Sequence, residues 1–376
     1  MSGVVISGTG VFTPPATVSN EALVESYNAF TEKWNAENAE AIAAGDLVAK
    51  ETSTSAFIEK ASGIKSRYFM EGEGPTNPDR MHPNLAAIAD KDAHGTPVQV
   101  KMALAAAEKA LEEAGVNGEN IDLVIISASF WERFLPSMAT ELQNILGAKG
   151  FAFDMSMACS SATFGISMAT DAIKSGMANK AVVVTAEYVS PFVNFEDRDS
   201  HFIFGDAAVA MVLEREGESS AESVFRINSR KLMTDFSTNI KAGFGSRVLL
   251  EREEIHDSIQ RFAQNGRSVF KELLPKVIDL VKGHLEENGR TVDDYKRFWL
   301  HQANINMNIY ATRKLLGKDP TQEKAPIILD EYANTAGAGC MIAFHKNKSD
   351  FTKGDLGLIC SFGASYSVGC MEVECL

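Results

Sequence analysis

Three short segments of the sequence offer side chains that together form a constellation for acyl transfer. Cys159 follows a strand-like run, His301 follows the apolar run FWL, and Asn334 opens a loop of small residues. A thiolate is both a good nucleophile and a good leaving group at a carbonyl carbon. Taken singly, the three could be a core cysteine, a hydrogen-bonded core histidine and a helix N-cap. Their joint occurrence at three strand ends favours catalysis, because sites in open α/β sheets gather there.

Cys159 is placed by a predicted strand, turn and buried helix. Phe151, Phe153 and Met155 alternate with smaller residues, as in a strand, and residues 162–175 are small or apolar nearly all round. The helix dipole and free N–H groups at such a helix start are expected to favour the thiolate. Small neighbours let a substrate reach the sulfur: Ala158, Ser160, Ser161 and Ala162.

The rest of the chain alternates helices with buried strands, which indicates an α/β fold with a sheet covered on both faces. A cluster of Glu, Gly and Ser near 215–222 predicts two halves, 1–215 and 216–376. Residues 28–56, which lack a strong apolar stripe, are interpreted as an exposed helical insertion. Predicted helices span 18–27, 97–114, 136–146 and 269–285, and predicted strands span 4–7, 121–129, 181–186, 201–214, 297–300, 356–361 and 368–373.

Composition excludes several classes of protein. The 376 residues are 45% hydrophobic and 23% charged, as in ordinary globular proteins. The net charge of −14 argues against a nucleic acid partner, and no apolar run is long enough to span a membrane. Five cysteines without CxxC spacing and an N-terminus without a basic signal region predict a cytoplasmic protein. The seven histidines form no convincing metal site, so we expect no metal.

Five motifs together resemble those of the β-ketoacyl-acyl-carrier-protein synthase III family of condensing enzymes. They are ACSSATFG around Cys159, HQAN at His301, NTAGAG at Asn334, FGD at 204–206 and FGASYSVG at 362–369. The similarity runs along nearly the whole chain. It implies a thiolase-like fold of two pseudo-equivalent halves, each with a five-stranded sheet, in five layers αβαβα. Members of the family are typically homodimers.

The resemblance also implies a reaction and the residues that perform it. Cys159 would take an acyl group from acyl-CoA, with the oxyanion held by the N–H groups of Cys159 and Ala364. His301 and Asn334 would donate hydrogen bonds to the thioester oxygen of malonyl-acyl-carrier protein as CO2 leaves. The carbanion would then attack acyl-Cys159 and give a 3-oxoacyl-acyl-carrier protein for fatty acid synthesis. No cofactor is required beyond acyl-CoA as substrate.

Family substrate-binding positions carry over residue by residue. Phe57 stands where many members have a Trp that stacks on the CoA adenine, Arg198 matches the adenine-side arginine, and Phe270 matches an aromatic residue near the pantetheine tunnel. Gly363, in the terminal motif, is a further substrate-binding candidate. Many members carry an Arg for the carrier protein after HQAN, where this chain has Asn306.

Carrier-protein docking requires local positive charge, because an acidic carrier is repelled by a net charge of −14. Arg267 and Lys271 lie on a predicted helix before the His301 strand, with Arg261 and Lys276 beside them, and they form the candidate dock. A solvated helix face explains the same charges.

Leu135 lies where the family projects a residue across the dimer interface to close the acyl pocket. Short-chain members often have Phe there, so the shorter Leu135 predicts a deeper pocket and a medium-chain primer of near eight carbons. Each buried methylene would contribute about 0.8 kcal/mol.

Other functions predict different residues. A biosynthetic thiolase needs a second catalytic cysteine in a C-G-G turn and a His in place of Asn334, and Cys340, Cys360 and Cys370 lie in no such turn. A head-to-head condensing enzyme or a hydroxymethylglutaryl-CoA synthase needs a glutamate base, for which Glu132 is a candidate, although a solvated loop carboxylate is the better explanation. A non-enzymatic scaffold would have lost Cys159, His301 or Asn334.

Overall fold

The computed structural model describes residues 3–89, 95–242 and 262–376. Across these ranges no helix combines the length and the apolar character that crossing a membrane requires.

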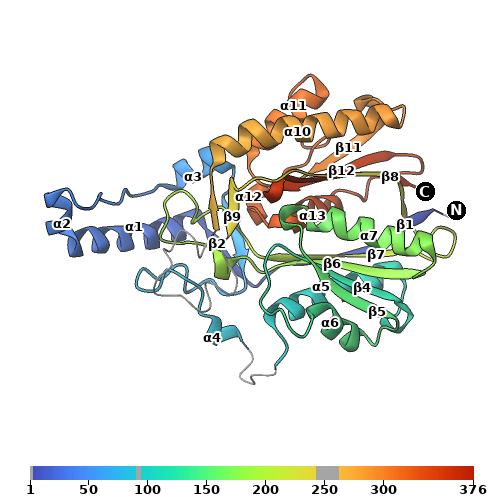
Figure 1. Ribbon diagram of the computed structural model, residues 1–376, viewed down its shortest axis with the longest axis horizontal. Coiled ribbons are helices and arrows are strands. Elements are labelled where there is room, and N and C mark those ends of the chain that lie inside the picture. Colours follow the sequence, from blue (N-terminus) through green and yellow to red (C-terminus); the bar gives the residue numbers. More distant parts are fainter. Residues whose placement is uncertain (1–2, 90–94, 243–261) are drawn as a thin grey trace.

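The first half of the chain builds one sheet with helices on both faces (Figure 1). β4 runs parallel to both β5 and β6, whereas β7 runs antiparallel to both β6 and β1. Helices α5 and α6 cover one face, and α7 covers the other. In spatial order the strands are β1 (Val4–Phe12), β7 (Ala207–Arg215), β6 (Lys180–Glu187), β4 (Leu123–Ser127) and β5 (Phe151–Met155). The helices are α5 (Val98–Ala114), α6 (Met138–Leu146) and α7 (Ser161–Ser175).

The second half repeats this arrangement with four strands among the described residues, where five were expected. The segment that would add the fifth forms one backbone–backbone hydrogen bond to the edge strand, from Phe298 N to Lys324 O at 2.8 Å. Pro326 follows, and its missing N–H cannot extend a ladder. In spatial order the strands are β11 (Tyr295–Leu300), β12 (Leu356–Gly363), β13 (Ser367–Cys375) and β8 (Phe225–Thr234). The helices are α10 (Gly266–Glu287), α11 (Ile305–Leu316) and α13 (Gly339–Lys346).

The two sheets stack with α7 and α13 between them, which confirms the predicted five layers αβαβα (Figure 1). A short pairing of Val5 and Ile6 with β8 also joins them edge to edge. Helix α7 packs closely on both sheets: a Cβ on Gly165 would lie 3.0 Å from Ser127 Oγ and from Val183 Cγ1 of the first sheet, and a Cβ on Gly369 of β13 would clash with Thr163. The predicted division of the chain falls where β7 ends and before β8 begins, and it stays a prediction.

The insertion forms a helical arm that projects from one end of the molecule (Figure 1). Ser19 caps α1 (Asn20–Glu37) through a 3.3 Å bond from Ala22 N, and α2 (Ala39–Ala44) follows. This helix runs ten residues beyond its predicted end at residue 27. The buried side chains of Leu23 and Tyr27 anchor its first turns in the body. The remaining elements are β2 (Ala16–Ser19), α3 (Ser55–Ser62), β3 (Ser66–Phe69), α4 (Leu85–Ile88), β9 (Ile240–Ala242), β10 (Phe262–Gln264) and α12 (Leu329–Tyr332).

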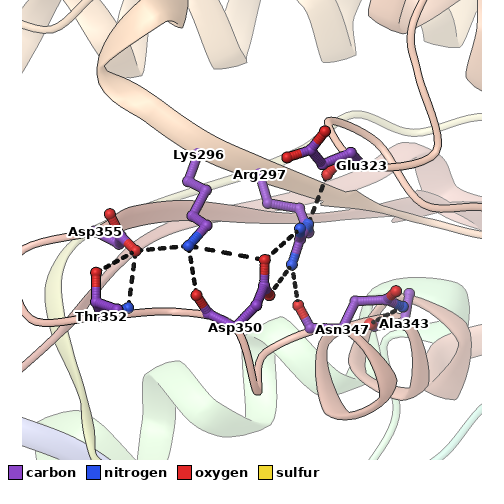
Figure 2. Close-up of polar contacts among 8 residues, drawn as sticks. All are labelled: Lys296, Arg297, Glu323, Ala343, Asn347, Asp350, Thr352 and Asp355. Atoms are coloured by element: carbon purple, nitrogen blue, oxygen red, sulfur yellow. Dashed lines mark hydrogen bonds and ion pairs between the residues drawn. The ribbon is translucent and has the colours of Figure 1, made fainter.

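An ionic network fixes β11, the edge strand that leads to His301 (Figure 2). Arg297 donates to both carboxylate oxygens of Asp350 at 2.6 and 3.0 Å, and to the carbonyl of Glu323 at 2.6 Å. Its neighbour Lys296 bonds Asp355 at 2.8 Å. Because Arg297 is buried and its bond to Asp350 is bidentate, this pair holds the strand more firmly than an exposed ion pair would.

Candidate active site

Cys159 lies in a tight turn between β5 and α7, as the sequence predicts. The turn, Ala158–Ser160, is a short 3-10 segment that begins with Ala158 at φ 46°. The end of β12 packs directly on the cysteine, since a Cβ on Gly363 would lie 2.9 Å from its Sγ. The backbone N–H groups of Cys159 and Ala364 both interact with the sulfur. These two N–H groups face the sulfur and are the candidate donors for an oxyanion on an acyl-cysteine.

The predicted preference for a thiolate is wrong in this resting site. Burial, followed by the charge of Glu187, raises the pKa of the Cys159 thiol to about 12. The N–H groups of Ala364 and Cys159 act in the opposite direction, but they do not outweigh the loss of solvent. The raised pKa favours the thiol over the thiolate in the resting site.

His301 follows β11 and packs beside the end of β12. Its backbone N–H donates to Cys360 O at 2.8 Å, and its ring meets Phe362 edge to face at 5.2 Å. The side chain is buried, and its Nδ1 has no hydrogen-bond partner within the described part of the chain. Burial lowers the pKa of His301 to about 4, so the imidazole is neutral at pH 7. A neutral imidazole can donate a hydrogen bond without bringing a charge.

Asn334 is held by hydrogen bonds on three sides. Its Oδ1 accepts from Ala336 N at 2.9 Å, which leaves the amide N–H groups to donate elsewhere. Its backbone N donates to Ile203 O at 3.0 Å, and its carbonyl accepts from Gly205 N at 3.1 Å. The glycine of the FGD motif thus serves to hold Asn334. The predicted strand 201–214 accordingly begins only at Ala207, the first residue of β7.

Backbone strain gathers around these residues. Four of the five non-glycine residues with positive φ among the described residues lie beside the candidate catalytic groups: Ala158, Ala333, Ala336 and Ser365. Ala333, directly before Asn334, has φ 56° and ψ −157°, a region close to one that is essentially reserved for glycine. Strain of this kind persists where the surrounding structure enforces a conformation.

The three candidate catalytic residues meet around the end of β12. The turn that holds Cys159 lies against β12 and against the Ala336–Ala338 turn. A Cβ on Gly337 would lie 3.3 Å from Ala158 O, so the loop of Asn334 contacts the turn of Cys159 directly. His301 reaches the same place through Phe362.

Sequence reasoning missed a buried carboxylate in this site. Glu187, the last residue of β6, accepts hydrogen bonds from Ser129 and from Gly337 N. The signal that could have revealed it is a charged residue directly after the apolar run AVVVTA. Other predicted strand ends also carry polar residues, so this position suited a site residue. Asp206 of the FGD motif is similar, since its carboxylate accepts from Val189, Ser190 and Met70.

The adenine-site candidates Phe57 and Arg198 lie together. The Arg198 guanidinium lies 4.4 Å from the Phe57 ring centroid, and its Nε donates to Thr52 O at 2.9 Å. The insertion therefore holds Arg198 over the aromatic ring. Phe270, on α10, packs instead against Tyr310 of α11 at 5.1 Å.

The remaining candidates lie on the surface. Leu135 and its neighbour Phe134 are 84% and 71% exposed. Arg267 and Lys271 are exposed on α10, whereas Lys276 is paired with Asp235 at 2.9 Å. Arg261 lies outside the described residues.

Glu132, the base required by the alternative condensing enzymes, has a structural role. Its carboxylate accepts from Gln99 N at 2.8 Å, in the first turn of α5, where a negative charge is favourable. Within the described ranges there is no group of three or more His, Cys, Asp or Glu side chains that could hold a metal ion.

Comparisons with known proteins agree with this geometry. Two family models match: 3-oxoacyl-[acyl-carrier-protein] synthase III over residues 153–231, and its C-terminal domain over residues 285–375. The chain is 47% identical to a beta-ketodecanoyl-[acyl-carrier-protein] synthase of Pseudomonas aeruginosa, over 92% of this chain and 98% of that protein. It is 31% identical to a beta-ketoacyl-[acyl-carrier-protein] synthase III of Agrobacterium fabrum, over 83% and 88% of the two chains.

The fold is that of the same group of proteins. The crystal structure of 3-oxoacyl-[acyl-carrier-protein] synthase III from Aquifex aeolicus superposes with a TM-score of 0.76 at 25% identity, over 99% of this chain and 100% of that one. Sequence identity, family models and fold thus agree, and the chain belongs to the β-ketoacyl-[acyl-carrier-protein] synthase III family of condensing acyltransferases.

Proposed function

We propose that this protein catalyses the decarboxylating Claisen condensation of an acyl-CoA with malonyl-acyl-carrier protein in fatty acid synthesis. The observation that carries the proposal is the convergence of the Cys159 and Ala364 N–H groups on the cysteine sulfur. The loop of Asn334 meets the same turn, and His301 packs on Phe362 near the end of β12. Both side chains supply further neutral donors. The name of the Pseudomonas relative describes a synthase of this class.

In the first half-reaction Cys159 attacks the acyl-CoA carbonyl. The oxyanion is held by the N–H groups of Cys159 and Ala364, and collapse of the intermediate expels coenzyme A. The thiol proton leaves on the coenzyme A sulfur, so acylation is neutral overall. Because the pKa of the resting thiol is raised, proton loss is part of the acylation barrier.

In the second half-reaction malonyl-acyl-carrier protein loses CO2. The neutral imidazole of His301 and the amide of Asn334 donate to its thioester oxygen, which stabilises the enolate. The carbanion attacks the acyl-Cys159 carbonyl, the Cys159 thiolate leaves, and a 3-oxoacyl-acyl-carrier protein is released. Neutral donors suit this step, because a charged imidazolium could protonate the carbanion.

We propose a medium-chain primer of near eight carbons. Addition of two carbons to such a primer gives a ten-carbon 3-oxo product, which corresponds to the name of the 47% identical relative.

The protein acts as a homodimer in this proposal, with Leu135 of each protomer closing the pocket of the other. Its exposure, and the exposed side chain of Phe134, support burial against a second copy. β5, which is an edge strand, offers further pairing groups.

The same proposal places the enzyme in the cytoplasm, a location supported by its five free thiols. Phe57 and Arg198 form the site for the CoA adenine, with Phe270 and Gly363 further along the substrate path. Arg267 and Lys271 dock the carrier protein. Charge reversal at both should raise KM for malonyl-acyl-carrier protein and leave acyl-CoA priming unchanged, whereas Lys33→Glu, on the distant arm, should change neither. If the kinetics with acyl-CoA and with malonyl-acyl-carrier protein change equally, Arg267 and Lys271 do not dock the carrier protein.

The proposed function is tested by intact-mass spectrometry of the protein after incubation with a panel of acyl-CoAs. One acyl adduct is expected, absent in Cys159→Ala and retained in Cys375→Ala. Addition of malonyl-acyl-carrier protein should remove the adduct and yield 3-oxoacyl-carrier protein and CO2. Wild-type transfer rates in Cys159→Ala would overturn the proposal.

A further inference from the structure

The carboxylate of Glu187 joins the two halves of the protein beneath the site, and the reaction steps above give it no role. It is fully buried and accepts from Ser129 N at 3.0 Å, Ser129 Oγ at 2.9 Å and Gly337 N at 2.9 Å. Ser129 follows β4 in the first sheet, whereas Gly337 lies in the loop that presents Asn334. One side chain therefore bonds the end of β4 in the first half and the Asn334 loop in the second half.

The contact between Glu187 and the loop is close. A Cβ on Gly337 would lie 2.8 Å from the Glu187 Oε1 and 3.3 Å from the carbonyl oxygen of Ala158. Gly337 therefore fills the space between the carboxylate and the turn of Cys159. The preceding amide, Ala336 N, is the one that bonds Asn334 Oδ1. Consecutive N–H groups of one strained loop thus bond Glu187 and Asn334, so a shift of Glu187 moves the Asn334 amide.

Glu187 also acts on the nucleophile through its charge. After burial, its carboxylate is the strongest influence that raises the pKa of the Cys159 thiol. The other titratable group that faces it is the buried carboxylate of Asp206, from the segment before β7. Burial and this like charge raise the pKa of Glu187 itself to about 7. Four hydrogen bonds from Ser129 and Gly337 favour its ionised form.

We propose that Glu187 is a positioning residue that holds the Asn334 loop against the Cys159 turn and places its carboxylate next to that turn. The inference rests on the proposed function, in which Asn334 serves decarboxylation and Cys159 serves acylation. A change at Glu187 should therefore separate the two half-reactions. It should also change the pH at which Cys159 titrates, although the hydrogen bonds of Glu187 go to Ser129 and Gly337.

The test compares Glu187→Gln and Glu187→Asp with the wild-type enzyme. In Glu187→Gln the charge is lost, so the midpoint of Cys159 alkylation by iodoacetamide against pH should fall by about one pH unit. Decarboxylation of malonyl-acyl-carrier protein should fall about tenfold in kcat, with KM little changed, because the Asn334 amide is displaced. Glu187→Asp keeps the charge but shortens the side chain, so it should lower decarboxylation while the alkylation midpoint stays in place.

Glu372→Gln is the matched control, since Glu372 is a buried, hydrogen-bonded glutamate on β13 whose partners are Asn228 and Tyr295. It should leave both readouts unchanged. An unchanged alkylation midpoint in Glu187→Gln, or an equal loss of acylation and decarboxylation, would overturn the inference. Alkylation needs no acyl-CoA, so a failure of the proposed function would appear separately, as a wild-type enzyme that forms no acyl adduct.

Discussion

A Cβ atom on Gly363 would lie 2.5 Å from the Cβ of Cys159 and 2.9 Å from its Sγ. Both distances are shorter than any ordinary contact between a Cβ and another heavy atom. The backbone at the end of β12 therefore approaches the nucleophile as closely as it does because residue 363 has no side chain. That approach also brings the N–H group of Ala364 to the sulfur.

Gly363→Ala should therefore disable acylation. The added methyl group must displace Cys159 or the end of β12, and a displacement of about 1 Å can cost on the order of 100-fold in rate. The rate of acyl-Cys159 formation, followed by intact mass, measures the loss. Gly266→Ala is the control, because a Cβ there meets no atom within 4 Å. A Gly363→Ala enzyme that acylates at the wild-type rate would show that the contact is dispensable.

His301→Ala and Asn334→Ala should spare acylation more than decarboxylation. Each removes one donor to the enolate, and comparable oxyanion donors contribute on the order of 2–4 kcal/mol. Single-turnover assays of the two half-reactions measure each loss, with Asn306→Ala as a control on the neighbouring helix. Equal losses in both half-reactions would mean that the assigned roles are wrong.

Stability should depend on pH through Glu187. Its pKa is raised from 4.5 to about 7 by burial, so the folded protein keeps a proton that the unfolded chain releases in this range. The contribution of Glu187 to stability therefore falls as pH rises from about 4.5 to about 7, and it is constant above. Relative to Glu187→Gln, which does not titrate, the wild-type protein should lose on the order of 3 kcal/mol across this window. Urea unfolding of both proteins at pH 5 and pH 8 measures the difference, and an equal gap at both values would contradict the prediction.

Leu135→Phe should shift primer preference toward shorter chains. A ring fills the space that the longer acyl chain would occupy, and each methylene that is no longer buried costs about 0.8 kcal/mol. The ratio of kcat/KM for octanoyl-CoA to that for acetyl-CoA reports the change. Phe236→Leu, at another exposed hydrophobic residue, is the control. If acetyl-CoA is the preferred primer of the wild-type enzyme and Leu135→Phe changes nothing, Leu135 does not set the depth of the pocket.

Residue patterns were sufficient to predict the helices and strands that depend on nearby residues alone. The helix predicted over 162–175 is α7, Ser161–Ser175, because its small residues and terminal Gly176 suit a helix between two sheets. The five layers followed from the resemblance that the ordered motifs carry. Cys159 and His301 lie at strand ends as predicted, whereas Asn334 follows the short helix α12 and forms an isolated bridge with Phe204. The roles of these residues stay predictions.

Features that depend on contacts between residues distant in the sequence could not be predicted from local patterns. The raised pKa of Cys159 depends on burial by β12 and on Glu187, which is distant in sequence. The role of Gly205 depends on Asn334. The second sheet has four strands among the described residues, where the resemblance implied five, because Pro326 has no N–H group with which to extend a ladder.

The strained alanines imply that the loops of the site are also the places where the fold opens most easily. Each such residue raises the energy of the native state by about 1–3 kcal/mol relative to relaxed backbone, and opening the loop releases it. Amide hydrogens near Ala333 and Ala336 should therefore exchange with solvent through local openings of lower free energy than those of the adjoining β12 and α13. A bound acyl chain or carrier protein that fixes these loops should slow their exchange far more than that of the sheets.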